Sequence, residues 1–66
     1  MNKIITLTLW KKEYPSADLL HICTNHISAF YRNKTGDDTY YTVVRMDDGS
    51  YYRVEETTSD ISMQMI

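Results

Sequence analysis

The feature that most constrains this chain of 66 residues is the stretch 39–56, which reads TYYTVVRMDDGSYYRVEE. Two runs rich in β-branched and aromatic residues flank Asp47–Gly49, and Asp-Gly between alternating apolar residues is the strongest short-range signal for a β-hairpin. A three-residue loop with its glycine in the left-handed conformation places Val44 opposite Tyr52. A two-residue turn would place Val44 opposite Arg53 and mix apolar with charged residues on each face. The sequence therefore predicts a central hairpin with the longer loop, in which Thr42 faces Val54.

This register divides the side chains of the hairpin between two faces. We expect one face to lie in the core, and it carries Tyr40, Val44, Met46, Tyr52 and Val54. The opposite face carries Tyr41, Val43, Arg45, Tyr51, Arg53 and Glu55. Because Tyr and Arg are enriched at binding hot spots, the second face is a candidate contact surface. The alternative is that its cross-strand Tyr–Arg pairs only stabilise an exposed sheet face.

Alternation within IITLTLW (4–10) predicts a first strand with Leu7 and Leu9 on one side and Trp10 on the other. There Trp10 either anchors a partner or caps the end of the sheet. The predicted partner-binding residues are therefore Trp10, Tyr41, Arg45, Tyr51 and Arg53.

The segments between the first strand and the hairpin are shorter and less regular. Pro15 predicts a turn through Tyr14–Asp18, followed by a second strand at Leu19–Cys23 and a third at His26–Tyr31. Thr24-Asn25 is typical of either a turn or a bulge, so the sequence leaves open whether these are two strands or one bent strand. Arg32–Asp38 carries the Asn, Gly and Asp residues of a loop, and we expect it to be the most exposed and mobile segment.

The residue pattern changes after the hairpin. Thr57 followed by Asp60 resembles a capping box, and Ile61 with Met65 gives a short helix one apolar stripe. A helix of about two turns is unstable alone, so it must pack on the sheet or on a neighbouring chain. The predicted fold is a mainly β α+β domain spanning residues 1–66. It has four or five antiparallel strands in a small curled sheet or partial barrel, and a short C-terminal helix.

Composition restricts the class of protein. The hydrophobic fraction of 42% and charged fraction of 24% favour a folded chain over a disordered one. A chain this short buries only about 60% of its unfolded surface, so the small core predicts a homodimer or higher oligomer.

No apolar run approaches the ~20 residues that cross a bilayer, and the start lacks a signal-peptide pattern. With Cys23 as the single cysteine, we expect a cytoplasmic protein without membrane contact.

No constellation of residues predicts catalysis or metal binding. His21, Cys23 and His26 are close in sequence, but structural zinc takes four ligands at recognised spacings. The Asp pairs at 37–38 and 47–48 flank turn glycines, where Asp bonds local backbone. No phosphate-binding or dinucleotide-binding glycine motif is present. We therefore expect no enzymatic activity, no metal and no cofactor.

Residues 27–66 follow a pattern of an isoleucine, a polar loop, a strand, a glycine turn, a second strand and a short helix, at Ile27, Thr42, Val44, Met46, Gly49, Tyr52, Val54, Glu56 and Ile61. This pattern resembles the FlbD family of small flagella-associated bacterial proteins, and the same β-turn-β-helix order is similar to part of LytTR-type DNA-binding domains. The resemblance implies a compact β-sheet protein that acts through binding, and it carries over no catalytic residue.

Two functions are consistent with these features. The first is a small non-enzymatic accessory module, bacterial or phage-derived, that binds and regulates or inhibits a larger protein. The second is a nucleic-acid or nucleotide binder in which Tyr rings stack on bases while Arg45, Arg53 and nearby lysines meet phosphates. The net charge of −2 argues against sequence-independent DNA binding, since proteins that bind DNA in this way usually carry a basic surface.

Overall fold

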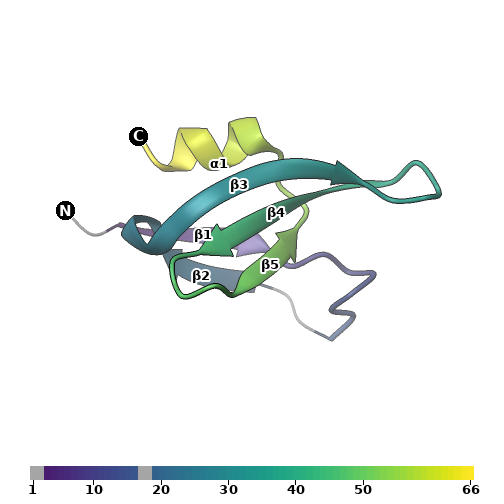
Figure 1. Cartoon of the computed structure of the whole chain (residues 1–66), viewed down its shortest axis with the longest axis horizontal. Helices are drawn as coiled ribbons and strands as arrows, with labels where there is room; N and C mark the ends of the chain where they lie inside the picture. Colours follow the sequence, from purple (N-terminus) through teal and green to yellow (C-terminus); the bar gives the residue numbers. More distant parts are fainter. Residues whose placement is uncertain (1–2, 17–18) are drawn as a thin grey trace.

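The computed structural model describes residues 3–16 and 19–66, and within them the chain forms five strands and one α-helix. The strands are β1 (Ile4–Thr8), β2 (Leu19–Cys23), β3 (Ile27–Lys34), β4 (Tyr40–Met46) and β5 (Tyr51–Val54), followed by α1 (Thr58–Gln64). They make two antiparallel sheets, β1–β2 and β3–β4–β5, which face each other with α1 along one side (Figure 1). In the described residues the sheets do not close into a barrel. The predicted mainly β fold with a short C-terminal helix is confirmed.

The β4–β5 hairpin has the predicted register. Val44 pairs with Tyr52 and Thr42 with Val54. The Met46 backbone N–H donates to the Ser50 carbonyl over 2.8 Å, which closes a loop of three residues. Gly49 has a φ of 91°, the left-handed conformation that this loop requires.

Replacing Gly49 with Ala should lower the free energy of unfolding by about 1–2 kcal/mol, because a Cβ disfavours the left-handed conformation. Gly36→Ala is the matched control, since a Cβ at either glycine meets open space and Gly36 has no positive φ. The control should stay within about 0.5 kcal/mol of the wild type. Urea unfolding measures both variants, and equal losses would show that the backbone of the loop is not under this constraint.

The first strand is shorter than predicted. Regular pairing with β2 ends at Thr8, where we expected the strand to continue to Trp10. Leu9 instead forms an isolated bridge with Val54, and the Trp10 N–H donates to the Arg53 carbonyl over 3.0 Å. Leu9 and Trp10 thus no longer pair with β2. They pair with β5 instead and so connect the two sheets.

The second and third strands are separate. One turn of 3-10 helix, η1 (Thr24–His26), divides them and sends them into different sheets. β3 begins at Ile27 and runs to Lys34, beyond the predicted end at Tyr31, because its polar end still pairs with the start of β4. The predicted loop is correspondingly reduced to residues 35–39. Of the predicted turn at 14–18, residues 17 and 18 lie outside the described residues.

The core lies between the two sheets and under the helix. Its buried members are Ile5, Leu7, Leu9, Ile22, Val44, Val54 and Ile61. The predicted capping box is present, since Thr57 Oγ1 accepts from the Asp60 N–H over 3.1 Å and Asp60 Oδ2 accepts from the Thr57 N–H over 3.3 Å. Of the two residues predicted to form the apolar stripe of the helix, Ile61 is buried in the core, whereas Met65 is exposed at the end of the helix.

Side chains, rather than a strand, complete the edge of β1 that faces away from β2. The Glu56 carboxylate accepts from the Thr8 N–H over 2.8 and 3.0 Å. The side-chain amide of Gln64 donates to the Thr6 carbonyl over 3.2 Å and accepts from its N–H over 3.4 Å. These bonds attach the C-terminal segment to β1 and cover an edge that would otherwise be free to pair. Within the described residues, no helix has the length and apolar character needed to span a membrane.

Candidate functional site

The candidate site is the face of the β3–β4–β5 sheet that points away from the core. Val43 pairs with both Tyr31 and Arg53, while Arg45 pairs with Tyr51. Cross-strand partners project from the same face of a sheet, opposite to the inward-facing residues such as Val44. We name this surface the Tyr/Arg face and define it by Tyr31, Arg45, Tyr51 and Arg53.

A stack of aromatic rings and one guanidinium supports this face. Trp10 stacks on Tyr41 with ring centroids 4.6 Å apart. The Arg53 guanidinium carbon lies 5.5 Å from the Tyr41 centroid and 5.2 Å from that of Tyr51, within the range of cation–π contacts. Arg53 also forms an ion pair with Glu13. The structure therefore brings four of the five predicted site residues into one contiguous group.

Tyr41 is the base of this group, with little free surface. It is only 9% exposed, because Trp10 covers its ring and Asn33 donates from Nδ2 to its hydroxyl over 3.2 Å. The pKa of Arg53 is raised, first by its contact with Tyr41 and also by the negative charge of Glu13. The pKa of Tyr14 is raised through its hydrogen bond to Glu13. Tyr41 and Arg53 are therefore best described as groups that hold the face in place.

The accessible part of the face consists of Tyr31, Arg45 and Tyr51. Tyr51 is 48% exposed and Tyr31 is 44% exposed, on either side of the hairpin strand that carries Arg45. Sequence reasoning did not include Tyr31, because the pairing of its strand with β4 was undetermined. The β3–β4 register pairs Tyr31 with Val43, and this pairing places Tyr31 on the Tyr/Arg face.

Tyr40 corrects one prediction. We expected it in the core, but it is 50% exposed, because it begins β4 at the far end of the β3–β4 hairpin, beyond the packed sheets. Arg32 and Lys34 lie over its ring, with Cζ at 5.5 Å and Nζ at 5.9 Å from the centroid. Tyr52 is partly buried against the core on the side that we predicted.

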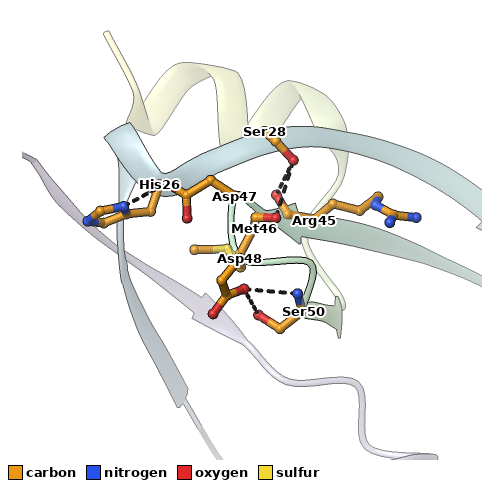
Figure 2. Close-up of polar contacts among 7 residues, drawn as sticks. All are labelled: His26, Ser28, Arg45, Met46, Asp47, Asp48 and Ser50. Carbon is orange, nitrogen blue, oxygen red and sulfur yellow. Dashed lines mark hydrogen bonds and ion pairs between the residues drawn. The ribbon is translucent and has the colours of Figure 1, made fainter.

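The turn between β4 and β5 is held by local polar contacts (Figure 2). His26 Nδ1 lies 2.9 Å from Asp47 Oδ2, and the Ser28 hydroxyl donates to the Arg45 carbonyl over 3.3 Å. Asp48 Oδ1 accepts from the N–H and the hydroxyl of Ser50 over 2.9 and 2.6 Å. The guanidinium of Arg45 points away from this group. Within residues 3–16 and 19–66, no carboxylate lies at ion-pair distance from Arg45.

The residues considered as metal ligands do not converge. His21 Nδ1 lies 3.0 Å from the Thr6 hydroxyl, His26 contacts Asp47, and Cys23 is a partly exposed free thiol. In the part of the chain that the structure describes, no three His, Cys, Asp or Glu side chains gather at metal-binding distance, and no pocket is found.

Stability should decrease as the pH falls below about 4. The pKa of Asp37 is lowered by Lys12 first and then by Thr35 and Thr39, and the pKa of Asp48 is lowered by the hydroxyl and then the N–H of Ser50. Each carboxylate has a lower pKa folded than unfolded, so its contribution is present above the unfolded value near 4 and is lost as protonation proceeds below it. Asp37→Asn combined with Asp48→Asn should flatten this acid limb in thermal melts. An unchanged limb would assign it to other groups.

Comparison of the chain with protein-family models, with curated proteins and with solved structures found no match. The resemblance to FlbD and LytTR proteins therefore stays a prediction.

Proposed function

We propose that the chain is a small, non-enzymatic module that binds and modulates a larger protein through the Tyr/Arg face. One observation supports this most: Tyr31 and Tyr51 are each about half exposed on one sheet face, and the strand between them carries Arg45, whose guanidinium has no ion-pair partner among the described residues. Tyrosine and arginine are, with tryptophan, the side chains most enriched among the residues whose truncation weakens protein interfaces.

The rigidity of the face also favours a binding role. Tyr51 is held by Arg53, which is itself fixed by Glu13 and by the Trp10–Tyr41 stack. A tyrosine loses little side-chain entropy on binding, and a side chain already held in position loses less. The supporting stack would thus increase affinity without itself touching the partner.

The distribution of charge favours a protein partner over a nucleic acid. Of the two arginines expected to meet phosphates, Arg53 is already neutralised by Glu13. Among nearby lysines, Lys12 and Lys34 are paired with Asp37 and Asp38, so Arg45 is the cation of this face without an ion-pair partner among the described residues, on a chain whose net charge is −2. Phosphate-led binding usually depends on several cations acting together. We therefore infer a protein surface that offers apolar contact for two tyrosines and an acceptor, a carboxylate or carbonyl, for one guanidinium.

Affinity capture from nuclease-treated lysate of the source organism tests the class of partner. The tagged chain should retain one protein in stoichiometric amount, and raising NaCl from about 50 to about 200 mM should weaken the complex only slightly. A complex that disappears on nuclease treatment, or whose affinity falls by a factor of ten or more over this range, would replace the proposal with the nucleic-acid alternative.

A further inference from the structure

β2 has one free backbone edge, and the ladder with β1 shows which groups lie on it. Thr6 and Thr8 direct their N–H groups to Gln64 and Glu56, away from β2. In an antiparallel ladder, two residues opposite each other either both point their backbone groups inward or both point them outward. His21 is opposite Thr6. It therefore directs its N–H and C=O out of the sheet.

The same alternation applies along the whole strand. Leu19 is opposite Thr8 and Cys23 is opposite Ile4, so both also direct their backbone groups outward. Within residues 3–16 and 19–66, no hydrogen bond joins the N–H groups of these residues to another segment, while the Cys23 carbonyl accepts the first bond of η1 as its N-cap. β2 thus presents the outward N–H groups of its first, third and fifth residues and the free outward carbonyls of Leu19 and His21.

The other strand edges in the described chain are covered or protected. Side chains of the C-terminal segment complete β1, and the bridge from Leu9 to Val54 meets β5. The outer edge of β3 lies along α1 and carries Arg32 and Lys34 (Figure 1). β2 reads LLHIC, without the Lys, Glu, Asp or Pro that natural proteins use to prevent edge pairing.

We propose that β2 pairs with β2 of a second copy of this chain, antiparallel, around a two-fold axis at His21. In this register His21 lies opposite the partner's His21, and Leu19 lies opposite the partner's Cys23. With the free carbonyls of Leu19 and His21 as acceptors, this register gives about four hydrogen bonds across the axis. The two β1–β2 sheets then become one sheet of four strands.

A second copy fits this edge better than a foreign strand. The edge is its own complement under a two-fold rotation, because outward groups at alternate positions place each N–H opposite a carbonyl. The strand contains no Lys, Arg, Asp or Glu, so two copies approach without repulsion between such charges. Pairing also covers Leu19, which is 55% exposed in the single chain.

His21→Pro tests the dimer without removing a backbone hydrogen bond of the single chain. Proline lacks the outward N–H, and it is tolerated on an edge strand where that N–H faces solvent. We expect light scattering at micromolar concentration to give twice the 7.8 kDa chain mass for the wild type and the single chain mass for His21→Pro. His21→Thr also loses the imidazole but keeps the N–H, and it should remain dimeric. A wild-type mass of one chain, or a dimeric and folded His21→Pro variant, would overturn the proposal.

A disulfide tests the register separately. In the Leu19→Cys variant the introduced thiol would face the partner's Cys23, whereas the two positions in one chain lie about 13 Å apart along β2. Diamide, which accepts the two electrons and two protons of the thiols, should convert most of this variant to a covalent dimer. Leu19→Cys with His21→Pro should stay monomeric. Equal crosslinking of the two variants would reject the register.

The dimer and the proposed function can fail independently. β2 and the Tyr/Arg face belong to different sheets, so the monomeric His21→Pro variant should still capture the partner protein.

Discussion

Ile61→Ala should remove about 2–5 kcal/mol from the free energy of unfolding, the range for truncating a fully buried isoleucine. Ile61 has no exposed surface, and it is the residue of α1 that reaches the core beside Leu7 and Val44. A helix of seven residues has no stability of its own, so its position depends on this side chain and on Gln64. For a domain this small, such a loss is a large fraction of its total stability.

Urea unfolding followed by Trp10 fluorescence measures this effect. Met63→Ala is the matched control, because Met63 lies on the same helix and is 72% exposed. It should change the free energy of unfolding by no more than about 0.5 kcal/mol. Similar losses in the two variants would mean that the helix is not anchored through Ile61.

Loss of the helix should also expose the edge of β1. Gln64 leaves with α1, so the Thr6 N–H loses its acceptor. The Thr6 amide should therefore exchange with solvent faster in Ile61→Ala than in Met63→Ala, beyond the change expected from global stability alone.

Tyr51→Ala should weaken binding to the captured protein partner by roughly 30-fold or more, as expected for a hot spot worth at least about 2 kcal/mol. The ring is half exposed on the Tyr/Arg face and is already ordered by Arg53. Calorimetric titration of the purified partner gives the dissociation constant.

Tyr40→Ala is the control for this measurement. Tyr40 is 50% exposed, nearly the same as Tyr51, but it lies on the opposite side of the sheet at the end of the β3–β4 hairpin. Its removal should change the dissociation constant by less than about threefold, well below the effect of losing a hot spot. Equal losses would mean that exposed aromatic surface in general, rather than this face, carries the binding.

Features that depend on neighbouring residues were predicted well from the sequence. The hairpin register followed from the alternation around one Asp-Gly, because a shift of one residue would have put Arg53 opposite Val44. The capping box followed from the spacing of Thr57 and Asp60. In both cases the determining interactions lie within a few residues of each other.

Features that depend on distant segments were predicted less well. The burial of Tyr41 requires Trp10, which arrives from the end of β1 across the sheet. The exposure of Tyr40 depends on how far β4 extends beyond the core, and the place of Tyr31 depends on the register of β3. Alternation assigns a residue to a face of the sheet, but what covers that face is decided by tertiary structure.

Chemical-shift mapping locates the partner-binding surface on the chain. In ¹⁵N spectra of the chain titrated with its captured partner, the largest changes should centre on the backbone amides of Tyr31, Arg45 and Tyr51, with those of α1 and Tyr40 nearly unchanged. Changes centred on α1 or on the β3–β4 hairpin tip, with the Tyr/Arg face unaffected, would contradict binding through this face.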